Sequence, residues 1–200
     1  MNKNFNVILD IDETMISAYP TEELDIENPK IKAKSVKFTL HNMDDYYVVF
    51  ERPNLQHFLD YVFANFNVSI WSAASKDYVL YVIQNIILTK PKRKLDYILY
   101  SYHCSVSKKI KKTSKSLRLL FDTFKLPNYT ISNTIIIDDL NAVCNVQKCN
   151  CINIKAFKML DDDSEKDKEL KILIDKLKKF KKVYSELKGR ACLTKLLSTL

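Results

Sequence analysis

Two short apolar runs, each ending in paired carboxylates, constrain the fold of this 200-residue chain more than any other feature. The run Val7-Ile8-Leu9 leads into Asp10-Ile11-Asp12, and the run 134–137 leads into Asp138-Asp139. Side chains alternate with period two along a strand, so Asp10 and Asp12 would leave the first strand close together. Paired carboxylates at a strand end suit a nucleophile beside a general acid or base, a site for a hard metal ion, or a solvated turn.

Strand-like runs alternate with helical periodicity along most of the chain. The strand-like runs fall at about 6–12, 67–73, 96–101, 133–138 and 151–155. Apolar residues at helical spacing mark the intervening segments at about 55–66, 78–86 and 117–124. This order predicts an α/β fold with a Rossmann-like central parallel sheet flanked by helices. Ligands of such sheets bind beyond the carboxyl ends of the strands, where both acidic pairs are expected.

The stretch between the first two strands is predicted to hold a small hairpin insertion at about 35–50. The runs 36–40 and 46–50 flank the polar segment 41–45, a pattern typical of two antiparallel strands and their turn. Residues 17–34 before the hairpin are expected to form an extended loop.

One long helix is predicted near the end of the chain. Ser164 suits the N-cap of a helix over about 165–187, and the acids that precede it favour the positive end of the helix dipole. We expect one domain over residues 1–188, long enough to bury a substantial core, and a tail at 189–200.

The composition excludes several classes of function. Gly189 is the only glycine, so no P-loop, dinucleotide-binding loop or kinase glycine loop can precede it. No apolar run reaches the length of a membrane span, and the strand-like run from Val7 leaves no room for a signal peptide. We therefore expect an intracellular protein without membrane contact. The use of Lys, Asn, Ile and Tyr favours an AT-biased genome, such as that of a virus or a parasite.

The five cysteines are odd in number and scattered, and they lack a zinc-binding spacing. We expect reduced, mostly buried thiols at Cys104, Cys144, Cys149, Cys151 and Cys192.

The charge of the chain indicates anionic partners, because the net charge is +8 and the pI is about 9.1. Basic runs occur at 90–94, at 108–112 and along the predicted C-terminal helix. These runs are either solvated faces or contacts for an anionic ligand, so nucleic acid is a second candidate partner.

Four segments together resemble the motifs of the haloacid dehalogenase superfamily. They are the two acidic pairs, Trp71-Ser72-Ala73 after an apolar run, and the basic segment Lys115-Ser116-Leu117-Arg118. More narrowly, 9–14, Glu51-Arg52-Pro53 and 70–78 resemble the RNA polymerase II C-terminal-domain (CTD) phosphatases and their small NLI-interacting-factor-like relatives. The resemblance covers about residues 5–180.

The resemblance implies a phosphatase that works through an aspartyl-phosphate. Asp10 would attack phosphorus, and Asp12 would protonate the leaving oxygen and later deprotonate the attacking water. Thr14 would hold the loop behind Asp10. Ser72 would hydrogen-bond a phosphoryl oxygen, and Lys115 would neutralise charge on the transferring group. The lysines of the 108–112 run compete with Lys115 for this role.

The resemblance also implies a Mg²⁺ site, because clustered carboxylates need a cation and Mg²⁺ is a hard ion. The expected ligands are Asp10, the main-chain carbonyl of Asp12 and Asp138. Asp139 is expected to act through water or to orient the others.

The expected substrate follows from an insertion too small to form a large cap domain. An open site would admit a phosphorylated protein, with Tyr78, Tyr19 and the hairpin's Val48 or Phe50 lining a peptide groove or belonging to the core. The leading hypothesis is a phosphoserine/phosphothreonine phosphatase whose candidate substrate is the RNA polymerase II CTD. The alternatives are a phosphatase of nucleic-acid ends or nucleotides, and a non-catalytic phospho-binding scaffold.

Three features depart from the family pattern. The relatives usually carry Asp-Asn where this chain has Asp138-Asp139, and Thr where it has Ser72. An arginine that contacts substrate in the small phosphatases has no evident counterpart, although His103 lies in the matching stretch and is a candidate substitute. This difference bears on the polymerase-tail substrate and not on the hydrolytic centre.

Overall fold

The computed structural model describes residues 5–186, and its centre is a five-stranded parallel sheet. The strands stand in the order β6-β5-β1-β7-β8, so β1 lies in the middle and the chain extends the sheet in both directions from it. Their bounds are β1 Asn6–Leu9, β5 Asn67–Trp71, β6 Leu95–Leu99, β7 Thr134–Asp138 and β8 Cys151–Asn153. The predicted α/β fold with a parallel sheet is confirmed.

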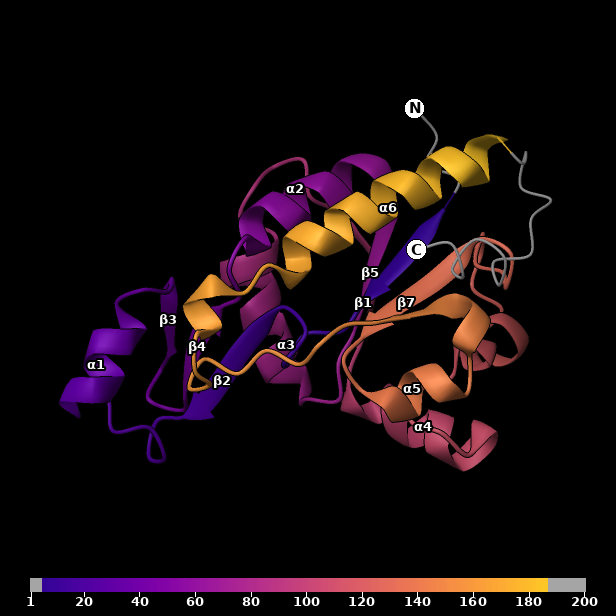
Figure 1. Ribbon diagram of the computed structural model, residues 1–200. Helices are drawn as coiled ribbons and strands as arrows, with labels where there is room; N and C mark the ends of the chain where they lie inside the picture. Colours follow the sequence, from indigo (N-terminus) through magenta and orange to yellow (C-terminus); the bar gives the residue numbers. More distant parts are fainter. Residues whose placement is uncertain (1–4, 187–200) are drawn as a thin grey trace.

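Helices cover both faces of this sheet, as Figure 1 shows. Alternation along β1 sends Val7 and Leu9 into one apolar cluster and Ile8 into another. The first cluster includes α2 (Leu55–Asn65), α3 (Lys76–Val82) and α6 (Glu169–Glu186), with α2 and α6 in contact. The second includes α4 (Ser101–Lys111), a π-helical turn at Leu119–Thr123 and α5 (Asn141–Asn145).

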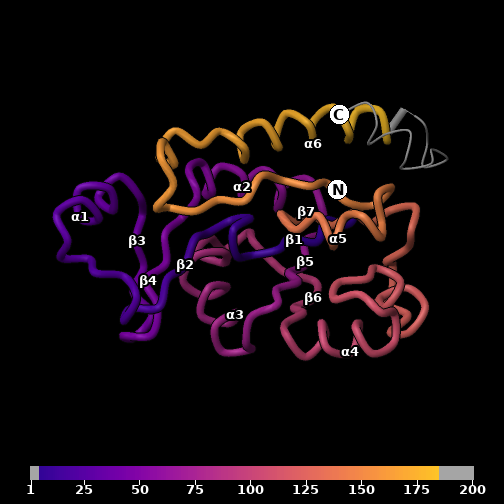
Figure 2. The backbone as a smooth tube through the Cα atoms, turned by 60° about the horizontal axis from the view of Figure 1, so that its bottom comes forward, coloured from indigo at the N-terminus to yellow at the C-terminus, as the bar shows by residue number. Residues whose placement is uncertain are grey.

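The insertion is larger than the predicted hairpin. It is a three-stranded antiparallel sheet in the order β2-β4-β3, with β2 at Ile16–Pro20, β3 at Leu40–Met43 and β4 at Tyr47–Glu51. The helix α1 (Pro29–Ser35) precedes β3. In Figures 1 and 2 this insertion projects from one end of the molecule.

The extended loop predicted for 17–34 is therefore wrong. The start of this stretch pairs with β4 as part of β2, and Asn28 caps α1 through a hydrogen bond from the Lys30 N–H, with Pro29 at the first helical position.

Two helices also differ from the prediction. The apolar spacing predicts no helix directly after β6, yet this segment forms α4, which buries only Cys104 and Ser107. The long C-terminal helix begins at Glu169 rather than 165, because the Ser164 hydroxyl donates to the Met159 carbonyl and Ser164 opens a short 3₁₀ turn instead. The predicted tail and the end of the predicted domain lie outside the described residues.

The prediction of reduced thiols is wrong for two cysteines. Cys144 on α5 and Cys151 at the start of β8 form a disulfide, because α5 packs against β8 and brings their Cα atoms to 5.1 Å. Cys104 and Cys149 are free, and Cys192 lies outside the described residues. Within residues 5–186, no helix combines the length and apolarity that a membrane crossing needs.

Candidate active site

Three carboxylates meet at the carboxyl ends of the two central strands. Parallel pairing of Leu9 with Ile137 places Asp10 beside Asp138, each just past the paired residues. Asp10, Asp138 and the half-buried Asp139 each offer an oxygen, and these oxygens lie within 4.8 Å of one another. The convergence that the two sequence runs predicted is therefore present.

A buried lysine faces this cluster. The Lys115 Nζ lies 2.5 Å from the Asp10 Oδ1 and 2.8 Å from the Asp138 Oδ2, and the side chain is 2% exposed. Burial alone would lower the pKa of Lys115, but the charges of Asp10 and Asp138 outweigh it and raise that pKa. The lysines of the 108–112 run lie in the last turn of α4 or directly after it. Lys115 is the lysine of this basic region that contacts the carboxylates.

The loop after β1 places Thr14 against the same carboxylates. Its hydroxyl lies 3.1 Å from the Asp10 Oδ2 and 3.3 Å from the Asp139 Oδ1. The turn is tight, since Glu13 adopts a left-handed conformation with φ 57°. Thr14 therefore contacts one oxygen of Asp10 and one of Asp139.

Arg52 anchors this turn and is a residue whose role sequence reasoning missed. Its guanidinium is buried, donates to the carbonyls of Glu13 and Thr14, and forms a two-bond ion pair with Asp167. The motif Glu51-Arg52-Pro53 drew attention to the arginine. Nothing in the sequence identified Asp167, which is 115 residues away.

The Asp12 side chain points away from the three-carboxylate cluster, toward α3. The Tyr78 hydroxyl donates to the Asp12 Oδ1 at 2.6 Å, and the Ser72 hydroxyl donates to the Oδ2 at 3.3 Å. Burial raises the pKa of Asp12, the charge of Asp10 raises it further, and the two hydroxyl contacts offset part of the increase. An aspartate with a raised pKa is suited to proton transfer.

The acidic pair on β7 is crowded by negative charge. Burial and the charge of Asp10 raise the pKa of Asp138 to about 6 and that of Asp139 to about 7. The Leu140 N–H occupies one Asp138 oxygen, and the Asn153 side chain holds the carbonyls of both residues. Converging hard oxygen donors that repel one another fit a Mg²⁺ ion.

The candidate groove residues divide between the site and the core. Tyr78 is buried, with its hydroxyl on Asp12, and Val48 and Phe50 are core residues of the insertion. Tyr19 is partly buried, packs beside Phe50 and accepts a hydrogen bond from the Leu160 N–H. His103 accepts from the Tyr100 N–H and packs among aromatic rings.

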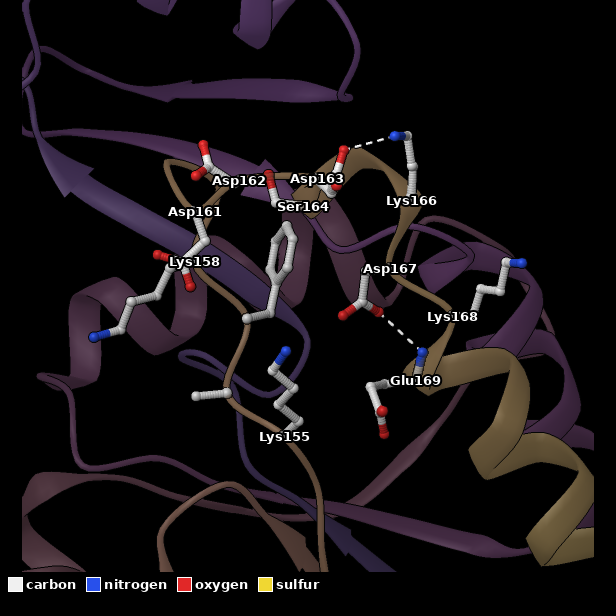
Figure 3. A pocket seen from close by; sticks show the side chains of 12 residues that line it. Lys155, Lys158, Asp161, Asp162, Asp163, Ser164, Lys166, Asp167, Lys168 and Glu169 are labelled. Carbon is white, nitrogen blue, oxygen red and sulfur yellow. Dashed lines mark hydrogen bonds and ion pairs between the residues drawn. The ribbon is translucent and has the colours of Figure 1, made fainter.

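A cavity of about 400 Å³ is lined by residues of the segment between β8 and α6 and by the first residue of α6 (Figure 3). Three ion pairs involve its lining: Asp163 pairs with Lys166, Asp167 with Arg52 and Lys158 with Glu13. None of the expected site residues, all within the described part of the chain, lines it. The segment touches the Thr14 turn, however, because the Phe157 N–H donates to the Glu13 carbonyl.

Comparison with known proteins finds a matching family and similar sequences. The chain matches the family of NLI interacting factor-like phosphatases over residues 5–187. It is 44% identical over 176 residues to the CTD phosphatase-like protein 355R of Invertebrate iridescent virus 6, covering 86% of this chain and 96% of that protein. It is 40% identical over 188 residues to the 355R protein of Invertebrate iridescent virus 3, covering 90% and 98%.

A solved structure has a similar fold at low identity. It is the fission yeast RNA polymerase II CTD phosphatase Fcp1 bound to beryllium fluoride, with a TM-score of 0.64 and 19% identity. The match covers 92% of this chain but only 64% of that one, so this chain spans just under two thirds of the yeast phosphatase structure.

Proposed function

We propose that this chain, which belongs to the NLI interacting factor-like phosphatase family, is a Mg²⁺-dependent protein phosphatase that works through an aspartyl-phosphate. The proposed substrate is phosphoserine or phosphothreonine in a protein, and the RNA polymerase II CTD is the candidate. The proposed catalytic domain is residues 1–188. The observation that carries the proposal is the convergence of Asp10, Lys115 and Asp138 at one sheet edge.

Asp10 is the proposed nucleophile. One of its oxygens bonds to phosphorus as the phosphorus–oxygen bond to the substrate side chain breaks. Asp12, whose pKa is raised, gives its proton to the leaving oxygen. Asp12 then takes a proton from a water that attacks phosphorus, which releases phosphate and restores Asp10.

Lys115 and Ser72 are proposed to stabilise the transferring group. The Lys115 ammonium already neutralises Asp10 and is placed to offset charge that builds on the phosphoryl oxygens. The Ser72 hydroxyl would exchange its hydrogen bond to the Asp12 Oδ2 for one to a phosphoryl oxygen. Thr14 would keep Asp10 in its orientation through the contact to Oδ2.

Asp10, Asp138 and Asp139 would hold Mg²⁺, together with the main-chain carbonyl of Asp12. The bound ion would supply a positive charge that shields the Asp10 carboxylate from the phosphate. The Asp12 side chain contacts Tyr78 and Ser72 and lies outside the three-carboxylate cluster, so it would not be taken up by the ion and could serve in proton transfer.

The small size of the insertion supports a protein substrate. Between residues 5 and 186 the insertion holds three short strands and one short helix, and no larger cap domain. The related viral proteins are named CTD phosphatase-like. We propose Tyr19 as a contact for substrate, and Tyr78 as the residue that positions Asp12, because only 6% of Tyr78 is exposed.

Two alternatives compete with this proposal. The net charge of +8 favours a phosphatase of nucleic-acid ends or nucleotides that uses the same centre. A non-catalytic phospho-binding scaffold is the third candidate, and turnover of any phosphate ester would exclude it.

The separating experiment offers the protein phosphoserine and phosphothreonine peptides beside 3′- and 5′-phosphorylated oligonucleotides at matched ionic strength. The proposal predicts higher kcat/KM on peptides. A preference for oligonucleotides that collapses with rising salt would instead assign the site to nucleic-acid ends. Tyr78→Phe should slow peptide and aryl-phosphate hydrolysis equally if Tyr78 acts through Asp12. Loss confined to peptides would place Tyr78 in a substrate groove.

A further inference from the structure

The segment that carries Lys115 has no regular secondary structure of its own. Residues 112–116 form a turn between α4 and the next helical stretch. Backbone groups in such a segment need hydrogen-bond partners from elsewhere. In this chain two side chains from separate parts of the sequence supply them.

Ser107 holds the first part of the segment. Its hydroxyl is buried on α4, donates to the Thr113 carbonyl at 2.6 Å and accepts from the Ser116 N–H at 3.1 Å. This contact joins the segment to the helix that precedes it.

Gln147 holds the backbone at Lys115 itself. Its Nε2 donates to the Lys115 carbonyl at 2.9 Å, and its Oε1 accepts from the Leu117 N–H at 2.9 Å. Both ends of one amide are therefore used on backbone groups that directly follow the Lys115 Cα. An apolar replacement would leave one donor and one acceptor without a partner.

Gln147 is itself held in place from both sides. The backbone N–H of Gln147 donates to the Cys144 carbonyl, and the backbone carbonyl of Gln147 accepts from the Asn150 N–H. The Cys144–Cys151 disulfide closes the short stretch that contains it. A fixed amide on a closed stretch can define the position of the segment that it binds.

We propose that Gln147 is a positioning residue for Lys115, acting through the backbone to keep the ammonium between Asp10 and Asp138. This inference rests on the proposed function of Lys115. The ammonium contacts of 2.5 and 2.8 Å leave little tolerance, because a displacement of about 1 Å in a catalytic group can cost on the order of 100-fold in rate.

The test begins with Gln147→Met, which keeps the length of the side chain and removes both hydrogen bonds. We expect kcat on an aryl phosphate to fall about 10- to 100-fold with KM nearly unchanged. Asn145→Ala is the matched control, because Asn145 is an exposed amide in the same stretch. It should retain wild-type kcat. Thermal unfolding of all variants checks that they are folded, and Gln147→Glu, which keeps an acceptor for the Leu117 N–H, replaces Gln147→Met if that variant does not fold.

A double-variant comparison separates positioning from a general structural effect. In a Lys115→Met background, Gln147→Met should reduce the residual single-turnover rate less than 2-fold, on the order of experimental error in additivity. If Gln147→Met costs the same factor with and without Lys115, Gln147 acts independently and the inference is wrong.

Chemical labelling tests the inference without catalysis. Acetic anhydride followed by peptide mass spectrometry should modify Lys115 slowly in the wild type and several-fold faster in Gln147→Met. Unchanged labelling together with unchanged kcat would overturn the inference. A wild-type protein that hydrolyses no phosphate ester would overturn the proposed function instead, and the labelling result would still decide whether Gln147 positions Lys115.

Discussion

The carboxylates of the site and the lysine that faces them are held by different means. Asp10 directly follows β1 and Asp138 is the last residue of the neighbouring parallel strand β7, so the hydrogen-bond register of the sheet fixes their separation. Lys115 lies on an irregular segment that relies on Ser107 and Gln147. The strand-borne groups therefore depend on the core, whereas the loop-borne group depends on a few hydrogen bonds that single substitutions can remove.

The largest expected effect comes from the strand side. Asp10→Asn keeps the shape of the side chain and removes the attacking charge, so hydrolysis of an aryl phosphate should fall by several orders of magnitude. Because the sheet register sets the fold there, the thermal unfolding midpoint should change little. Turnover close to that of the wild type would show that Asp10 is not the nucleophile.

Metal removal tests the strand-borne carboxylates as a group. EDTA should abolish turnover and excess Mg²⁺ should restore it, since the cluster of Asp10, Asp138 and Asp139 supplies hard oxygen donors. Ca²⁺ should restore it poorly because its coordination is longer and looser. Full activity in the chelator would show that the cluster holds no catalytic ion.

A smaller loss is expected on the loop side. Lys115→Met removes one stabilising charge and leaves the nucleophile, so kcat should fall about 100- to 1,000-fold, as with the loss of one oxyanion donor. Lys115→Arg is the matched variant that keeps the charge, and it should recover part of the rate. Equal loss in both variants would mean that geometry, rather than charge, is what Lys115 contributes.

An ion-pair cluster remote from both sides gives the smallest expected effect. Lys90 and Arg93 hydrogen-bond to Asp60 and lower its pKa, so the cluster stabilises the folded state above the ordinary aspartate pKa of about 3.9. That contribution is lost as the pH falls through the lowered pKa. Asp60 is largely exposed, so Asp60→Asn should change the unfolding free energy by less than about 1 kcal/mol at pH 7 and leave kcat unchanged. Denaturant titrations at pH 7 and pH 3 measure the unfolding free energy, and a steady-state assay measures kcat.

The sequence predicted the strand-borne half of the site because its signals are local. The apolar run before Asp10 and the run before Asp138 each define a buried strand and its end. Parallel sheets bring such ends to one edge. The choice of Lys115 over the 108–112 run depended on a resemblance, and the structure places Lys115 on the carboxylates.

Local sequence patterns could not predict contacts between segments that are far apart in the chain. The pairing of Arg52 with Asp167 spans 115 residues, and Gln147 reaches Lys115 from 32 residues away. Neither pairing leaves a periodicity in the sequence. The prediction for 17–34 is wrong because β2 is defined by its pairing with β4, which the local sequence does not show. The disulfide could not be predicted because α5 and β8 come together only in the folded chain.

The central claim is that Asp10 becomes covalently phosphorylated, and acid-quenched single turnover tests it most directly. A substrate carrying labelled phosphate is mixed with excess enzyme, quenched in acid and digested, and the peptides are read by mass spectrometry. The account predicts the label on Asp10 in the wild type and its absence in Asp10→Asn. Hydrolysis with the label on another side chain, or with no labelled protein at any quench time in the wild type and in slower variants, would contradict it.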